Sequence, residues 1–250
     1  MPTLKSISYF LSTTLKVNII SDIAYNGIQV AASDNIKKIA FAVDACEATF
    51  KEAIKQNCDL LIVHHGLFWG SGTTSLQGID AKRIQFLFKN NLSLYAVHLP
   101  LDIHPTLGNN AHLAKICNLK KSLPFAEFAG TKCGSYGKCN SDLNLLVKKL
   151  NSTLKTKSIV LQFGKKQIRN LGIVAGAGAD AISECHQYNI DTLLTGEFKH
   201  SKYHPAKELG INIIASGHYA TETGGVKSLM PLLKRKFKVT TLFLDLPTGF

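Results

Sequence analysis

Stretches of apolar residues alternate with amphipathic helical patterns along most of the chain, and this alternation predicts the fold class. In the first half, apolar runs at 36–45, 59–65 and 92–99 are separated by helical patterns at 46–57 and 78–91. Such a rhythm is typical of βα units that build a largely parallel sheet. We therefore expect an α/β protein.

The second half of the chain repeats this alternation. Its apolar runs lie at 169–177, 191–197, 211–217 and 239–247, and its helical patterns lie at 179–189, 201–210 and 224–236. Residues 39–68 can be laid over residues 171–200 without a gap, which places Asp59 over Asp191. Self-similarity of this kind indicates that one structural unit has been used twice. We therefore expect two intertwined, repeated α/β units with mixed, largely parallel β-sheets.

No linker rich in Pro, Gly and Ser separates the two copies, so the sequence does not mark a sharp boundary. The stretch 122–140 is the natural seam, which gives 1–125 and 126–250 as approximate units. A duplication places the strand ends of both copies in comparable positions. Because open α/β sheets bind ligands at the carboxyl ends of their strands, polar residues that follow the apolar runs are the candidates for a site.

The composition, with 45% hydrophobic and 18% charged residues, is that of an ordinary globular protein. The first 20 residues mix Lys and Ser into an amphipathic pattern that does not match a signal peptide. No apolar stretch reaches the roughly 18 residues expected of a membrane span. We therefore expect a cytoplasmic protein that has no contact with membranes.

The six cysteines include no pair with CxxC spacing, which argues against a disulfide framework and a zinc knuckle. Only Cys133 and Cys139 lie close together, and reduced, structural thiols are the expectation for both. Lys and Arg outnumber Asp and Glu by 29 to 17, a net charge of +12 that favours anionic partners. The excess is spread along the chain without interleaved aromatics, so a nucleic-acid partner is only weakly supported.

His64 and His65 directly follow an apolar run, at the point where a buried strand gives way to a loop. Two consecutive imidazoles point in different directions, so each can serve one of two adjacent metal ions. The pair taken alone is equally compatible with one packed core histidine and one exposed histidine, because imidazole is found in both places.

The next strand ends near His98, and Asp102 follows in the adjoining loop. A carboxylate there can complete an imidazole site for a divalent metal. His98 and His104 lie nearby and compete as ligands or as partners that support the ligands. Asp102 is also compatible with a simple turn or helix-cap residue.

His218 and Glu222 have i, i+4 spacing at the start of a helix that follows the third strand end. Both side chains then lie on one helix face, close enough to hold one ion or to bridge two. The same spacing also suits an ordinary solvated surface pair. Glu197 and His204 are reserve candidates at the rim of the site.

Together the three strand ends predict one site with the ligands His64, His65, Asp102, His218 and Glu222. Nitrogen and oxygen ligands without thiolate suit zinc, manganese or iron(II). Two such ions per chain would activate water and orient a reacting oxygen, which is the chemistry of a hydrolase.

Several motifs resemble one family when they are taken in order. They are NGIQV at 26, VDAC at 43, LLIVHHGLFW at 60, HLPLD at 98, GNN at 108, TGE at 195 and GHYATETGG at 217. This combination resembles the Nif-three-like family, whose members are also named GTP cyclohydrolase I type 2 homologues. The chain is similar to its short form, which lacks a large central insertion, and it has Tyr219 where GHHATE is more frequent.

The resemblance implies a toroidal homohexamer with metals that face an inner cavity, and the same five ligands with Glu222 as the bridging carboxylate. Apart from the resemblance, the position of His98 beside Asp102 makes it a residue that we expect to support the ligands. The implied activity is hydrolysis of GTP or a related nucleotide, or of another phosphate-bearing small molecule. The alternative is a non-catalytic metal-binding ring that stores metal or binds a protein or nucleic acid.

Overall fold

The computed structural model describes residues 1–70 and 75–250, and contacts divide the chain into two compact units. The first unit consists of residues 1–101 and 225–246, and the second consists of residues 102–224 and 247–250. These two units are defined by contacts between residues. The boundary expected near residue 125 separates the two repeats of the sequence, so that boundary stays a prediction. The α/β fold with two mixed sheets is confirmed.

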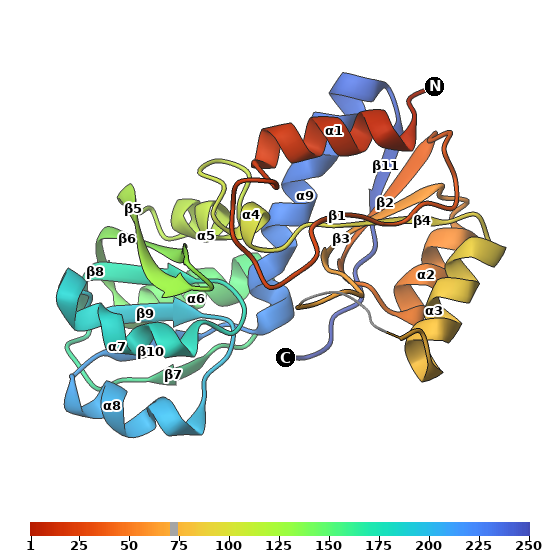
Figure 1. Ribbon diagram of the computed structural model, residues 1–250. Helices are drawn as coiled ribbons and strands as arrows, with labels where there is room; N and C mark the ends of the chain where they lie inside the picture. Colours follow the sequence, from red (N-terminus) through yellow and green to blue (C-terminus); the bar gives the residue numbers. More distant parts are fainter. Residues whose placement is uncertain (71–74) are drawn as a thin grey trace. The chain divides into compact units, whose positions relative to one another are not determined.

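The first unit is built on a five-stranded sheet in the order β1-β4-β3-β2-β11 (Figure 1). Its strands are β1 (Gly27–Val30), β2 (Lys38–Asp44), β3 (Leu60–His65), β4 (Ser93–Ala96) and β11 (Thr240–Phe243). All neighbours pair in parallel except β1 and β4. Strands β2, β3 and β4 are nearly continuous apolar runs because both faces of this sheet are covered.

Helices cover the two faces of this sheet (Figure 1). They are α1 (Leu4–Leu15), α2 (Glu47–Lys55), α3 (Gly78–Lys89) and the part of α9 (His218–Phe237) that lies in the first unit. Phe10 of α1 meets Phe237 of α9 edge to face, with ring centroids 5.5 Å apart. On the other face, Phe50 of α2 and Leu87 of α3 are completely buried against the sheet. The apolar stripe of each helix therefore supplies the core.

The second unit is built on a six-stranded sheet in the order β5-β6-β8-β9-β10-β7 (Figure 1). Its strands are β5 (Lys120–Phe128), β6 (Thr131–Asp142), β7 (Ile159–Leu161), β8 (Gln167–Val174), β9 (Thr192–Thr195) and β10 (Asn212–Ala215). Only β8, β9 and β10 run parallel to one another. The remaining three pairings are antiparallel, so this sheet is less parallel than the sequence suggests.

Short helices accompany the second sheet. They are α5 (Asn109–Ile116), α6 (Leu143–Leu154), α7 (Ile182–Cys185), α8 (Tyr203–Glu208) and three 3-10 helices, η1 (Gly178–Ala181), η2 (His186–Tyr188) and η3 (His200–Lys202). Helix α6 begins where the Asp142 carboxylate accepts hydrogen bonds from the backbone N–H groups of Asn144 and Leu145. The short helix α4 (Leu99–Asp102) ends on the first residue of the second unit.

The repeated sequence adopts a repeated local structure. In the first unit, the Asp59 carboxylate accepts the backbone N–H groups of Lys37 and Lys38 at 2.7 and 3.0 Å. In the second, Asp191 accepts the N–H groups of two residues at the start of β8, at 2.9 and 3.0 Å. The overlay of Asp59 on Asp191 therefore matches a shared contact between neighbouring strands.

Two stretches differ from the sequence expectation. The seam at 122–140, for which no strand was expected, forms most of the β5–β6 hairpin, whose strands pair directly. The helical pattern at 179–189 is broken into η1, α7 and η2, and a Cβ atom at Gly178, where η1 begins, would lie 2.4 Å from Val174 Cβ.

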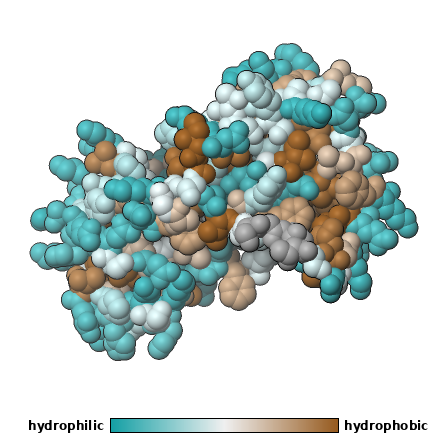
Figure 2. All heavy atoms as spheres, viewed as in Figure 1, coloured by the Kyte–Doolittle hydropathy of each residue, from teal (hydrophilic) through white to brown (hydrophobic). Residues whose placement is uncertain are grey.

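Hydrophilic residues make up most of the surface drawn in Figure 2, and exposed hydrophobic residues are scattered among them. Within the described ranges, no helix is both long and apolar enough to cross a bilayer.

Candidate metal centre

In the first unit, the carboxyl end of β3 carries the two consecutive histidines. The fully buried His64 donates its Nδ1–H to the carbonyl oxygen of Val97, 3.0 Å away. His65 lies opposite Asp44 of β2 in the parallel ladder, and its Nδ1 is 2.8 Å from the Asp44 carboxylate. Both rings are thus fixed through the same nitrogen by an oxygen acceptor on a neighbouring strand.

The third histidine of this unit, His98, is held by a carboxylate from a distant loop. Its Nδ1 lies 2.9 Å from Oδ1 of Asp22, whose side chain is 2% exposed. The Asp22 carboxylate also accepts the backbone N–H groups of Ala24 and Leu99. Burial raises the pKa of the Asp22 carboxyl, but the hydrogen bond and charge of His98, together with the bonds from Asn26 and Ala24, lower it below its usual value.

His64, His65 and His98 form one cluster at the end of the sheet. The His64 ring centroid is 4.6 Å from that of His65 and 5.0 Å from that of His98. One ring nitrogen of each lies within 4.8 Å of the others, a spacing that a metal ion can bridge. Trp69 closes one side, with its ring edge-on to His98 at 5.1 Å and its indole N–H donated to the Gly66 carbonyl. The structure therefore makes His98 a candidate metal ligand, in addition to its expected role as a residue that supports the ligands.

In the second unit, α9 begins at His218, as the i, i+4 pattern predicts, and brings His218 and Glu222 onto one face. His218 Nε2 is 3.1 Å from Oε1 of Glu222, while its Nδ1 is hydrogen-bonded to Glu197. Burial lowers the pKa of His218, but the hydrogen bonds and charges of Glu222 and Glu197 outweigh it and raise the pKa to about 9. Without metal, this imidazole is therefore held as a cation between two carboxylates.

Because Gly176 has no side chain, it leaves room for the side chains of Glu222 and His218. A Cβ atom at this position would lie 2.1 Å from Glu222 Oε1 and 3.0 Å from His218 Nε2. The backbone is held there because the Gly176 N–H donates to Thr221 Oγ1 and its carbonyl accepts the N–H of Gly196. Since its φ is +65°, glycine also suits this turn conformationally. The turn at Gly176 therefore contributes to the site by leaving room for its side chains.

Asp102, which is 7% exposed, contributes a second carboxylate in this unit. Its Oδ1 accepts a hydrogen bond of 2.8 Å from the side-chain amide of Asn109, at the start of α5. One of its oxygens lies within 4.8 Å of an oxygen of Glu222. Two buried carboxylates at this spacing repel each other unless a cation lies between them.

The imidazoles share one arrangement, and this arrangement indicates whether these residues suit a divalent metal. His64, His65, His98 and His218 all direct Nδ1 at a carbonyl or carboxylate oxygen. Protein ligands to metal ions are arranged in this way, because the second hydrogen bond fixes the tautomer and leaves Nε2 to bind the ion. In each unit the imidazole nitrogens, and in the second unit also the carboxylates of Asp102 and Glu222, are donors that suit a divalent metal such as zinc, manganese or iron.

The remaining candidates have other contacts. His104 uses Nδ1 to accept the backbone N–H of Leu107, and His204 lies against the ring of Tyr203. Neither belongs to a group of ligand atoms within metal-binding distance in the described ranges. Glu197 orients His218, and Tyr219 is buried with its N–H donated to the last residue of the chain.

Asp22 and Asp44 were not expected from the sequence. Asp44 could have been found, because it ends the strand β2 beside β3 and so follows the same strand-end rule as His65. Asp22 carries no local signal, since it lies 76 residues before His98 in a segment without periodic pattern.

Comparisons with known proteins agree with this fold. Residues 2–248 match the family model described as Duf34/NIF3 (NGG1p interacting factor 3). A protein of Pyrococcus abyssi named GTP cyclohydrolase 1 type 2 homolog is 42% identical over 248 residues, which cover 98% of each chain.

Two solved structures are similar over nearly the whole chain. Protein ybgI, described as of unknown function, is 29% identical with a TM-score of 0.91, and 99% of this chain and 100% of that chain are covered. TTHA1606 from Thermus thermophilus is 35% identical with a TM-score of 0.89 and the same coverage. The full-length family match and these likenesses show that the chain belongs to the Duf34/NIF3 family.

Proposed function

We propose that the protein binds two divalent metal ions per chain and is a metal-dependent hydrolase of GTP or a related nucleotide. The observation that supports metal binding best is the shared orientation of the four imidazoles, each with Nδ1 bound to an oxygen acceptor. The five ligands proposed from the sequence are His64, His65, Asp102, His218 and Glu222.

The chain's own groups divide into ligands and orienting residues. Val97, Asp44 and Glu197 orient His64, His65 and His218 through Nδ1, so Nε2 is the atom of each that would bind an ion. Glu222, whose Oε1 lies 3.1 Å from Nε2 of His218 and which has an oxygen within 4.8 Å of an oxygen of Asp102, is the carboxylate best suited to bridge two ions. When bound, divalent ions supply Lewis acidity and lower the pKa of water.

His98 is the remaining polar side chain in the proposal, and its imidazole can contact a ligand near the reacting atoms. Its Nδ1 is committed to Asp22, and the hydrogen bonds of Ala24 and Leu99 to Asp22 fix that carboxylate in turn. The imidazole thus has a set orientation with Nε2 directed toward the cluster. Trp69 beside it offers an aromatic surface that is 40% exposed, which suits a planar base.

The choice of substrate rests on the relatives and on charge. The curated relatives bear the name GTP cyclohydrolase 1 type 2 homolog, and this chain's net charge of +12 favours an anionic substrate such as a triphosphate.

The test is to incubate metal-loaded protein with GTP and to follow the loss of GTP and the appearance of product by chromatography. Glu222→Gln should retain the fold and lose turnover by about a hundredfold or more, because the bridging charge is removed. Glu208→Gln removes the same charge from an exposed position on α8 and should leave turnover unchanged. Turnover that survives in Glu222→Gln, or that needs no metal, would overturn the hydrolase proposal.

A non-catalytic metal-binding function is favoured by one observation. The carboxylates of Asp22, Asp44 and Glu197 are each bound to an imidazole, so none of them is placed to exchange protons with a substrate. A protein that retains two metals but does not convert GTP or other nucleotides would support this alternative.

We also propose a homohexamer, as the family resemblance implies. Its mass in solution is measured by light scattering, and a monomer at micromolar concentration would refute it.

A further inference from the structure

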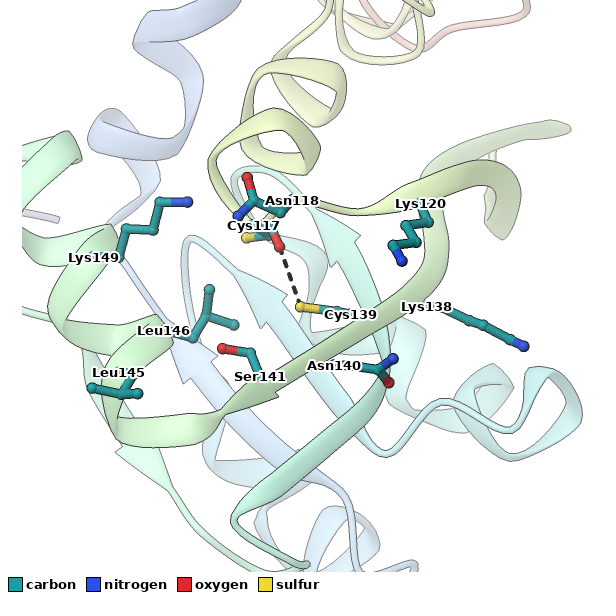
Figure 3. A pocket seen from close by; sticks show the side chains of 10 residues that line it. All are labelled: Cys117, Asn118, Lys120, Lys138, Cys139, Asn140, Ser141, Leu145, Leu146 and Lys149. Atoms are coloured by element: carbon teal, nitrogen blue, oxygen red, sulfur yellow. Dashed lines mark hydrogen bonds between the residues drawn. The ribbon is translucent and has the colours of Figure 1, made fainter.

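A pocket in the second unit lies apart from the residues described above. It is a cavity of about 310 Å³ between the end of α5, the start of α6 and the strands β5 and β6 (Figure 3). Its polar lining consists of Asn118, Lys120, Lys138, Asn140, Ser141 and Lys149. None of the described residues that line it is Asp or Glu. The charged groups of the lining are therefore all cations, and they lie beside neutral polar side chains, two cysteines and two leucines.

The three lysines come from three different elements. Figure 3 shows Lys149 extending from α6 toward Asn118, with Lys120 on the opposite side and the amine of Lys138 pointing outward. None of the three forms an ion pair with a described carboxylate. The nearby carboxylates of Asp142 and Asp191 are engaged with backbone N–H groups. In the described part of the chain, these three lysines are thus not paired directly with a carboxylate.

Lys120 and Lys138 are direct cross-strand partners in the antiparallel β5–β6 pair. Like charges at directly opposed positions destabilise a sheet. An anion bound between or beside them would remove this repulsion. A purely structural hairpin gains nothing from this pair.

The backbone at the pocket is irregular in both strands. The β5–β6 register shifts between Lys120 and Leu123, and the β6–β8 register shifts between Lys138 and Ser141. In addition, Asn118 and Lys121 have φ values of 54° and 52°, and a lysine in this region is strained. Bulges re-aim side chains and are over-represented beside functional sites. Here they turn a regular hairpin edge into the wall of a cavity.

The floor of the pocket consists of two neutral thiols. Cys139 donates its S–H to the carbonyl oxygen of Cys117, 3.3 Å away, as the dashed line in Figure 3 shows. Burial raises the pKa of the Cys139 thiol to about 11 and raises the pKa of Cys117 as well. Neither thiol is charged near neutral pH, so the floor does not repel an anion.

We propose that this pocket binds the phosphate group of a small phosphorylated compound, with Lys120 and Lys149 as the contacting cations and Asn118 and Ser141 as hydrogen-bonding groups. The volume of about 310 Å³ lies at the lower end of the roughly 300–1,000 Å³ typical of small-ligand sites. That size suits a phosphate monoester such as a mononucleotide. Flexible ammonium groups bind phosphate as point charges, which fits several lysines placed around one cavity.

The probes are inorganic phosphate and adenosine 5′-monophosphate, titrated separately into full-length protein that has been freed of metal and dialysed. Removal of metal keeps the two probes from binding at the metal centre, so a negative result here does not depend on the hydrolase proposal. The variants are Lys149→Gln and Lys120→Gln. The matched control is Lys148→Gln, which removes the same charge from the position of α6 that precedes Lys149. Lys148 is exposed and does not line the pocket.

Isothermal titration calorimetry at low ionic strength should show that Lys149→Gln and Lys120→Gln each weaken binding of both probes about tenfold, as expected for one lost charge-assisted hydrogen bond. Lys148→Gln should change affinity by less than about twofold. Tighter binding of adenosine 5′-monophosphate than of phosphate would identify an ester as the preferred source, and equal binding would identify free phosphate.

Two results would overturn the proposal. One is the absence of binding of either probe to the wild-type protein at millimolar concentration. The other is an equal loss of affinity in Lys148→Gln and in the two pocket variants, both for the two probes and for a single-stranded oligonucleotide. That pattern indicates binding by diffuse surface charge in place of a site.

Discussion

Replacing Gly176 with alanine should weaken metal binding strongly while it lowers the free energy of unfolding only modestly. The added Cβ would lie 2.1 Å from Glu222 Oε1, whereas real Cβ contacts do not fall below 3.0 Å, so this oxygen must move by about 0.9 Å. Metal–ligand distances tolerate deviations of only about 0.2 Å. The displacement is thus several times larger than a bound ion accepts, although no ligand has been removed.

The effect on stability should be modest. Glu222 Oε1 is the far end of a flexible side chain, so it can shift at little cost in packing. The main penalty is the φ of +65°, which costs an alanine about 1 kcal/mol in the free energy of unfolding. Gly210→Ala is the matched control, because Gly210 has a φ of +66° and its Cβ would meet only the carbonyl oxygen of Phe163, at 3.9 Å.

Both variants should lose about 1 kcal/mol in urea unfolding of the metal-free protein. Only Gly176→Ala should bind zinc or manganese about 10- to 100-fold more weakly, as measured by competition with a chelating dye. If Gly176→Ala binds metal as tightly as Gly210→Ala, Glu222 is not a ligand in the position described.

Three further outcomes are expected. Asp22→Ala should lower the free energy of unfolding by about 2–4 kcal/mol at pH 7, because it leaves His98 and buried N–H groups without their acceptor. Since the pKa of Asp22 is lowered on folding, its contribution is fully present above the unfolded value of 3.8 and is lost as the pH falls through the folded pKa. The stability difference between wild type and Asp22→Ala in urea titrations should therefore shrink at acid pH, and a constant difference would contradict the assignment. Asp59→Ala and Asp191→Ala should each cost about 1–2 kcal/mol, and the double variant should lose the sum within about 0.5 kcal/mol because the two carboxylates share no partner. A much smaller or larger loss in the double variant would show that the two repeats are coupled at these positions.

Much of the fold could be predicted because the central strands of both units are buried on both faces. Residues 60–63 of β3 are apolar without interruption and Leu193 and Leu194 of β9 are likewise completely buried, so polar side chains that reach a site lie at the ends of such strands. The strand-end rule therefore led directly to His64, His65 and His218.

The β5–β6 hairpin escaped prediction for a physical reason. Its strands are half exposed and antiparallel, so their hydrogen bonds and not an apolar pattern hold them together. The glycines at 134 and 137, which resemble loop residues, are needed because a Cβ at either position would clash with a neighbouring strand.

The orienting residues were beyond the reach of local pattern. Asp22 meets His98 across 76 residues of sequence, and Glu197 meets His218 across 21, so each pairing depends on the completed fold. Hydrogen bonding of Nδ1 is invisible in the sequence, yet it is the feature that distinguishes a histidine prepared to bind metal from a packed one.

The most direct test of the central claim is a crystal structure of metal-loaded protein, with anomalous diffraction recorded at the absorption edge of the added ion. The account predicts anomalous peaks about 2.0–2.2 Å from Nε2 of His64, His65 and His218 and from carboxylate oxygens of Asp102 and Glu222. Fully loaded protein whose peaks lie away from these atoms, or protein that retains no metal, would contradict it.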